Sequence, residues 1–246
     1  MDPVRSSDSP YAEDEARLRE LPEIELLGIM RRSSNYTFLA RLGPEPQVLA
    51  VYKPAAGESP LWDFPTGTLY RRELAAYLLA RELGWPRVPP TVVRENAPHG
   101  VGALQLFVDA DLDRHYLNSR GEAEATWKEI ALFDVLANNA DRKSGHCLTD
   151  PQGRVWVIDH GVTFHTDDKL RTVIWDFAGR TAPKRLRADV RRTLDALDGG
   201  AFGNSLRELL SAREVRALRR RLAAVLEPGW RFPEPGSAWS VPWPPV

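Results

Sequence analysis

The chain has 246 residues, of which 43% are hydrophobic and 27% charged, and its 33 basic and 34 acidic side chains nearly cancel. This composition excludes a chain disordered throughout, and no apolar run is long enough to span a membrane. Nucleic-acid binding requires surplus cations that this chain lacks, so we expect a cytoplasmic globular protein with no stable membrane anchor and no nucleic-acid partner.

The first half of the sequence is typical of a β-rich lobe. Residues 1–22 are polar and acidic, and we expect them to form a flexible leader, although RLREL at 17–21 could begin a short helix. Apolar runs bounded by turn residues predict five short strands, at 24–30, 36–42, 48–54, 91–95 and 102–108. Helical spacing of apolar residues over 68–83, followed by Gly84, predicts an amphipathic helix. These strands and this helix are expected to form an N-lobe over 23–108.

The second half is predicted to be mainly helical. Helical spacing recurs in three segments, at 122–138, 183–197 and 211–228. Ser211 and Glu214 indicate a capping box at the start of the third segment. Residues 148–159 are typical of a strand, a Pro-Gly turn and a second strand. We expect a helical C-lobe over 109–228, followed by a Pro- and Trp-rich tail over 229–246 whose tryptophans either pack on the body or bind a partner.

Lysine is scarce in this chain, because 28 of its 33 basic residues are arginines. Lys53 ends an apolar strand, where a cation either extends into solvent or points into a cleft. Glu73 lies in the helix that follows, and packing of that helix on the sheet could bring the carboxylate to the ammonium. Such a pair would keep the lysine charged and directed toward a phosphate.

Two aspartates follow regular elements in the second half. Asp141 lies in a polar loop after a helix, where it either closes the helix in a turn or accepts a proton from an attacking hydroxyl. Asp159 ends an apolar strand two residues before Gly161, where it is either a satisfied hairpin end or a ligand of a divalent cation. A strand lysine, a helix glutamate, a loop aspartate and an Asp-x-Gly occur in this order in protein-kinase-like chains.

These segments resemble the phosphatidylinositol 3- and 4-kinase superfamily, most closely the type II phosphatidylinositol 4-kinases, their bacterial relatives and the actinobacterial kinase-like proteins. The similar segments are RSSNYTF at 32–38, AVYKP at 50–54, GTLYRRELAAY at 67–77, GALQLFV at 102–108, NADR at 139–142 and IDHG at 158–161. The resemblance covers roughly residues 25 to 165. It implies an α+β, bilobal protein-kinase-like fold with a β-rich N-lobe and a mostly helical C-lobe.

The resemblance also implies a role for each matching residue. Asp141 would act on the acceptor hydroxyl, and Lys53, oriented by Glu73, would bind the α- and β-phosphates of ATP. Asp159 would coordinate Mg²⁺ that bridges phosphate oxygens. The other implied nucleotide-binding residues are Ser33, Ser34 and Asn35 at the phosphates, the backbone of Phe107 and Val108 at the adenine edge, and Lys143 toward the γ-phosphate or the acceptor.

Two features depart from the family pattern. Where relatives carry a magnesium-binding asparagine, five residues after Asp141, this chain has His146. Imidazole suits zinc or manganese better than magnesium, so His146 either contacts a phosphate or the acceptor, or it alters a metal site that Mn²⁺ would then also occupy. The cysteine-rich stretch through which type II lipid kinases are palmitoylated is absent, which argues against a lipid acceptor.

The predicted function is ATP-dependent transfer of the γ-phosphate to a hydroxyl of a protein Ser or Thr, or of a small metabolite. The alternatives are a pseudokinase that binds ATP without transferring phosphate, and a regulatory protein that transfers AMP. A hydrolase with a transition metal is a third alternative, although its candidate ligands lack the usual spacing; they are His146, Asp159, His160 and His165. The sequence leaves the oligomeric state open.

Acceptor recognition is expected from the C-lobe. The candidates lie beyond the Asp-x-Gly segment, in a region that either contacts the acceptor or forms a solvated acidic loop with one packed tryptophan; they are Asp167, Asp168, Trp175 and Asp176. Trp62 and Phe64, which precede the first predicted helix, either lean over the nucleotide or pack in the core.

Overall fold

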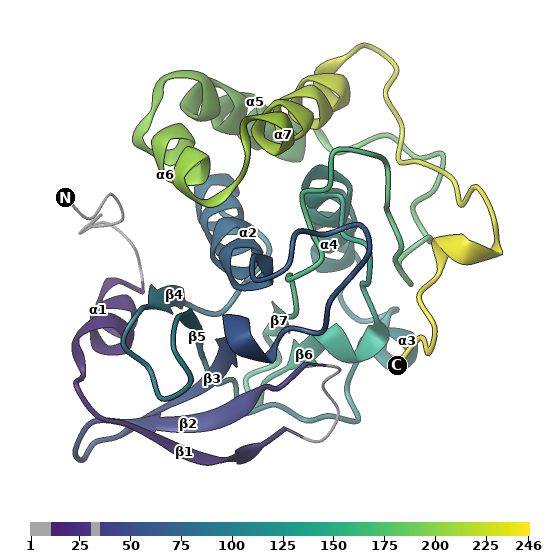
Figure 1. Ribbon diagram of the computed structural model, residues 1–246. Helices are drawn as coiled ribbons and strands as arrows, with labels where there is room; N and C mark the ends of the chain where they lie inside the picture. The colour runs from purple at the N-terminus through teal and green to yellow at the C-terminus, as the bar shows by residue number, and fades with distance from the viewer. Residues whose placement is uncertain (1–10, 31–34) are drawn as a thin grey trace.

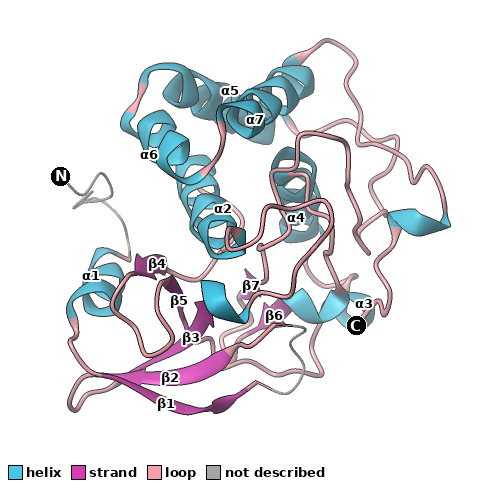
Figure 2. Cartoon of the chain, viewed as in Figure 1, coloured by secondary structure: helices cyan, strands magenta, loops and turns pink. Residues whose placement is uncertain are grey.

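The computed structural model describes residues 11–30 and 35–246, which form a β-rich lobe and a helical lobe (Figures 1 and 2). The N-lobe contains an antiparallel sheet with strand order β1-β2-β3-β5-β4. Its strands are β1 (Ile24–Ile29), β2 (Phe38–Leu42), β3 (Val48–Pro54), β4 (Thr91–Arg94) and β5 (Gly102–Leu106). All lie within the predicted apolar runs, because the alternation of apolar and polar side chains matches the period of a half-buried strand.

Alternation along β3 sets the direction of Lys53. Ala50 and Tyr52 on one face of the strand are fully buried in the N-lobe core, so Lys53 lies on the opposite face. A single-residue change of register would place the lysine in the core. The apolar pattern of this strand therefore directs the ammonium away from the N-lobe core.

Helix α2 (Leu69–Leu83) lies between the sheet and the helical lobe (Figure 1). It ends at Gly84, whose φ of 84° is left-handed and favours glycine, as the sequence predicts. Arg72 on this helix is buried and connects the lobes, because its Nη1 donates to Thr163 O at 3.1 Å and its Nη2 to Glu214 Oε1 at 2.5 Å.

The prediction of a flexible leader over residues 1–22 is wrong for its second half, which forms helix α1 (Ala12–Glu20). Leu18 is fully buried against the sheet, and Glu15 accepts a hydrogen bond from Tyr77 Oη at 2.6 Å. A helix this short and polar is not stable alone, so its stability comes from these tertiary contacts, which periodicity does not report. Residues 1–10 lie outside the described residues.

The C-lobe is mainly helical, and its apolar core also includes buried residues of α2. Its helices are α3 (Tyr116–Ser119), α4 (Glu124–Ala137), α5 (Lys184–Gly199), α6 (Ala201–Leu209) and α7 (Ala212–Leu226), and its hairpin comprises β6 (Cys147–Thr149) and β7 (Val155–Val157). The predicted capping box is confirmed, because Ser211 and Glu214 exchange backbone-to-side-chain hydrogen bonds. Helix α6 is not predicted by its sequence, which contains the weak helix formers Gly203, Asn204 and Ser205.

The tail over 229–246 runs along the C-lobe and contains one short 3-10 turn, η3 (Ala238–Ser240). In the described part of the chain, no helix combines the length and apolar character that crossing a membrane requires. The β-rich lobe, followed by the helical lobe, confirms the predicted α+β architecture.

Replacing Arg72 with methionine is expected to lower the free energy of unfolding by about 3 kcal/mol, because it breaks a buried ion pair. The neighbouring exposed Arg71 provides the matched control, and Arg71→Met should cost less than about 0.5 kcal/mol. Urea unfolding of both variants measures the two values. Equal losses of unfolding free energy in the two variants would contradict a structural role for the contacts of Arg72 between the lobes.

Candidate active site

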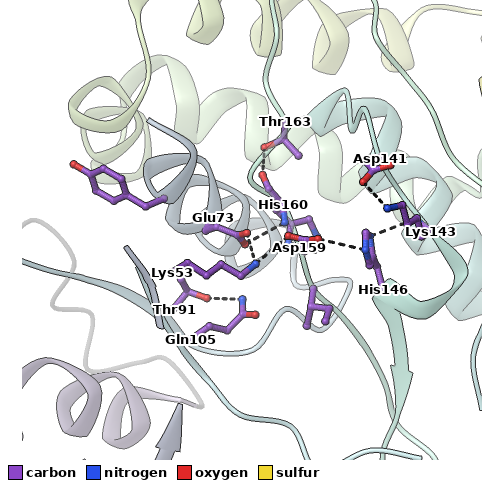
Figure 3. A network of polar contacts seen from close by, with 12 residues as sticks. Lys53, Glu73, Thr91, Gln105, Asp141, Lys143, His146, Asp159, His160 and Thr163 are labelled. Atoms are coloured by element: carbon purple, nitrogen blue, oxygen red, sulfur yellow. Dashed lines mark hydrogen bonds and ion pairs between the residues drawn. The ribbon is translucent and has the colours of Figure 1, made fainter. Parts of the chain in front are cut away.

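Lys53 is the centre of the polar network in Figure 3. Its Nζ donates to Glu73 Oε1 at 2.5 Å and to Asp159 Oδ1 at 3.1 Å. Burial by itself would lower the pKa of Lys53, but the charges of Asp159 and Glu73 outweigh it and raise that pKa above its ordinary value. The same ammonium holds the pKa of Asp159 well below its usual range. Lys53 and Asp159 are therefore charged at neutral pH.

Glu73 also contacts the backbone of the helical lobe. Its Oε2 accepts a hydrogen bond from the His160 N–H at 3.1 Å, next to Asp159, and the Glu73 side chain is almost completely buried. Asp159 has a φ of 63°, in the left-handed region that non-glycine residues seldom adopt. Because the neighbouring N–H is bound to Glu73, α2 helps to stabilise this backbone conformation.

Arg142 joins the predicted catalytic loop (residues 139–146) to the Asp159 turn. Arg142 and Asp134 on α4 are both fully buried and form an ion pair at 3.0 Å. The same guanidinium donates to Ile158 O at 2.9 Å and lies 2.8 Å from His160 Nε2. A guanidinium can only donate, so Nε2 is the acceptor there. Burial and the adjacent Arg142 charge lower the pKa of His160 well below its ordinary value, so this ring is neutral.

Asp141 lies at the cleft edge of the catalytic loop, just after α4 ends at Asn138 in a left-handed conformation. Its backbone N–H donates to Asn139 Oδ1 at 3.0 Å, and its carboxylate lies 3.4 Å from Lys143 Nζ. Burial raises the pKa of Asp141 above its ordinary value, although the charge of Lys143 opposes this. A carboxylate with a raised pKa is a better proton acceptor.

His146 lies on the other side of Asp159 from Lys53 (Figure 3), at the end of the short turn η2 (Ser144–His146). Its Nε2 is 3.3 Å from Asp159 Oδ2. Burial, together with the charges of Arg142 and Lys143, lowers the pKa of His146 to about 4, so the ring is neutral at pH 7. Its Nδ1 accepts a long hydrogen bond from Lys143 N at 3.4 Å, which places the ring proton on Nε2, facing Asp159.

Asp159 and His146 are two neighbouring side chains that could hold a divalent metal ion. Asp159 and His146 bring a carboxylate and a neutral imidazole to about the spacing of two neighbouring ligands. Among residues 11–30 and 35–246, no three His, Cys, Asp or Glu side chains converge into a complete protein cage. Magnesium usually binds one or two carboxylates together with substrate phosphates, so a pair of protein ligands is compatible with such a site.

The network opens on a cleft between the two lobes. Its lining includes Asn35, Tyr36, Thr37, Lys53, Pro54, Glu58, Leu69, Tyr70, Glu73, Asp141, Asp159, Gly161 and Val162. Glu58 was not found by sequence reasoning, because it lies in an aperiodic loop between a strand and a helix. Its Oε1 accepts the Tyr70 N–H at 2.9 Å, whereas its buried Oε2 has no hydrogen-bond partner within the described residues.

Of the other predicted nucleotide-binding residues, some line the cleft and others do not. Asn35 lines the cleft, and its Oδ1 accepts the Ser59 N–H at 2.8 Å. Phe107 and Val108 follow β5 and are not part of the cleft lining, and the Phe107 N–H already donates to Leu49 O at 3.0 Å. Ser33 and Ser34 lie outside the described residues.

Two of the side chains considered for acceptor recognition have structural partners. Asp176 accepts a hydrogen bond from Tyr116 Oη at 2.6 Å, and Trp175 Nε1 donates to Ser240 O at 3.3 Å. Asp167 and Asp168 follow the Asp-x-Gly segment, and the Asp167 side chain is exposed.

The two aromatic residues before α2 have different environments. Phe64 is buried against His165 and the Arg72 guanidinium. The Trp62 ring is 90% exposed and contacts Lys169 Nζ at 4.5 Å, so neither ring covers the cleft.

Comparison with known proteins identifies the fold. No family model matches the chain. The crystal structure of the Golgi casein kinase is 16% identical, with a TM-score of 0.52 over 91% of this chain and 75% of that one. The Helicobacter pylori proinflammatory kinase CtkA is 14% identical, with a TM-score of 0.52 over 82% of this chain and 91% of that one. These similarities show a kinase-like fold.

Two relatives are similar in sequence. Phosphatidylinositol 4-kinase gamma 4 of Oryza sativa subsp. japonica is 32% identical over 108 residues, which cover 37% of this chain but only 19% of that protein. The match agrees with a kinase-like fold and is too short to place the chain among the phosphatidylinositol kinases. Protein Rv2133c of Mycobacterium tuberculosis is 38% identical over 259 residues, which cover 90% of this chain and 92% of that protein. The chain therefore belongs to the family of protein Rv2133c.

Proposed function

We propose that this protein is an ATP-dependent phosphotransferase of the phosphatidylinositol 3- and 4-kinase-like type, which transfers the γ-phosphate of ATP to a hydroxyl of a protein or small-molecule acceptor. The observation that carries the proposal is the contact of Lys53 with both Glu73 and Asp159, beside Asp141, in a kinase-like fold. Phosphoryl transfer depends mainly on positioning and on compensation of phosphate charge, and this arrangement can supply both.

Lys53 is suited to bind phosphate. Its contact with buried Glu73 keeps it charged and fixes its direction, whereas Asp159 is half-exposed at the cleft. On ATP binding, Lys53 would keep Glu73 and exchange Asp159 for the α- and β-phosphates. Asp159 and His146 would hold a divalent metal, with the His146 ring proton moved to Nδ1 and the long hydrogen bond from Lys143 N given up. A bound metal supplies positive charge to phosphate oxygens.

Asp141 is suited to act on the acceptor. Its carboxylate faces the same cleft as Lys53, and its raised pKa favours acceptance of a proton from a hydroxyl. Lys143, at 3.4 Å, keeps that carboxylate oriented and is placed to approach the transferred phosphate. The acceptor hydroxyl would then attack from the Asp141 side of the cleft.

The reaction is tested by incubating the protein with ATP and Mg²⁺ or Mn²⁺, together with candidate proteins and metabolites, and identifying products by mass spectrometry. Lys53→Met and Asp159→Ala should each lower turnover about 100-fold or more, because Lys53 compensates phosphate charge directly and Asp159 would hold the metal ion that does so. Lys128→Met is the control, because Lys128 forms a surface pair with Glu124. A product that carries AMP would contradict phosphoryl transfer. Thermal stabilisation of the protein by ATP without any turnover would also contradict it.

Asp141→Asn is expected to lower kcat about 100-fold and to leave the Kd for ATP within about threefold of the parent value. The amide keeps the shape of the side chain but cannot accept the hydroxyl proton. Calorimetric titration with a non-hydrolysable ATP analogue measures binding separately from turnover. An unchanged kcat would remove Asp141 from the proposed chemistry.

His146→Asn is expected to shift the metal preference toward Mg²⁺, weakening Mn²⁺ binding about tenfold in the presence of ATP. Loss of the imidazole removes a nitrogen ligand that favours Mn²⁺ over Mg²⁺. Electron paramagnetic resonance of bound Mn²⁺ measures this directly, and nitrogen coupling in the parent spectrum should disappear in the variant. Identical spectra would place His146 outside the metal site.

A further inference from the structure

Residues 237–245 of the tail, here termed the strap, lie against a segment of the C-lobe that precedes α5 (Figure 1). Thr172 N donates to Ser240 O at 3.0 Å, and Arg171 Nε donates to Trp239 O at 3.0 Å. Trp175 Nε1 also donates to Ser240 O, at 3.3 Å. The strap is thus bound through its backbone carbonyls.

The segment under the strap, residues 171–173, contacts the catalytic loop along its other edge. Arg142 N donates to Arg171 O at 2.9 Å, and Val173 N donates to Arg142 O at 3.1 Å. Arg171 N also donates to Asn139 O at 2.9 Å. Residues 171–173 therefore lie between the catalytic loop and the strap and are hydrogen-bonded to both.

The strap also contacts the catalytic loop directly. Ser144 N donates to Pro245 O at 2.7 Å. The hydroxyl of the same fully buried serine accepts the Leu117 N–H at 2.9 Å and lies 2.7 Å from His115 Nδ1. Ser144 is therefore fixed between the strap and the start of α3. Asp141 lies between Asn139 and Arg142, whose main-chain groups bind residues 171–173, and three residues before the Ser144 anchor.

The composition of the strap suits a fixed backbone. Pro242, Pro244 and Pro245 restrict φ, which lowers the entropy lost when the segment is ordered. The rings of Trp239 and Trp243 are 80% and 85% exposed, so the strap is held by backbone bonds rather than by burial of these rings. The prolines of the strap thus help to keep its backbone in the conformation that binds the C-lobe.

We propose that the strap is a positioning element of the active site, which holds the catalytic loop so that Asp141 meets the acceptor hydroxyl. This inference rests on the proposed phosphotransferase function. A loop without regular structure needs partners for its backbone groups, and the strap supplies one directly at Ser144 and supports others through residues 171–173. Within the described residues, the hydrogen bonds of the strap reach the catalytic loop and residues 171–173 and not Lys53 or Glu73, so the strap acts on the catalytic loop rather than on the lysine pair.

Two variants test the strap. One ends after Gly236, and the other keeps the chain length but replaces residues 237–245 with glycine and serine. Both should show a kcat about tenfold or more below the parent value, with the KM for ATP changed less than about threefold. Hydrogen exchange in residues 139–146 should be about tenfold faster. A synthetic peptide of residues 237–246 should restore kcat to the shortened chain, whereas a scrambled peptide should not.

The outcomes separate the two proposals. A parent protein that transfers no phosphate rejects the phosphotransferase, whereas unchanged hydrogen exchange at residues 139–146 in both variants rejects the strap whatever the turnover. A parallel loss of ATP binding and kcat also overturns the strap, because it would indicate general destabilisation rather than positioning of the loop. Restoration of kcat by the scrambled peptide would also overturn the strap proposal, because the rescue would not depend on the sequence of the strap.

Discussion

The buried ion pair of Arg142 and Asp134 is the interaction on which the rest of the site depends. A guanidinium in a water-free core requires compensation of its charge and acceptors for its N–H groups. Asp134 supplies the charge, and Ile158 O and His160 Nε2 supply further acceptors. These partners come from α4 and from the turn after β7, so satisfying one buried cation fixes the loop that bears Asp141 relative to the turn that bears Asp159.

Glu73 provides the corresponding constraint between the lobes. One of its oxygens accepts from Lys53 and the other from the His160 N–H, so the position of α2 depends on the helical lobe as much as on the sheet. Arg72 adds buried contacts with Thr163 and Glu214. Displacement of α2 would leave several buried charged or polar groups without partners, which favours a permanently assembled Lys53–Glu73 pair over one that must be completed by a conformational change.

The kinase-like neighbours and the Rv2133c family describe this chain at different levels. The structural neighbours show a shared kinase-like fold and are too distant in sequence to indicate an acceptor. His146 gives this site a chemistry of its own, because a neutral imidazole lies at the position where the resembling lipid kinases carry asparagine. The resemblance to the phosphatidylinositol kinases therefore predicts the fold and most of the site, and leaves the acceptor to experiment.

The sequence by itself determined the strands and the long helices, because hydrophobic period and turn residues are local signals that fix which face a side chain occupies. The order of Lys53, Glu73, Asp141 and Asp159 along the chain, and the resemblance to kinase-like chains, predicted the site residues. Only the tertiary structure decided the rest: helix α1, the cleft position of Glu58, the role of Arg142 and the contact of Ser144 with the strap. Each of these features depends on burial or on backbone hydrogen bonds between segments that are distant in the sequence. Neither leaves a periodic pattern in the sequence. A polar helix is stabilised by the core it covers, and an irregular tail by the carbonyls it offers to a neighbouring loop.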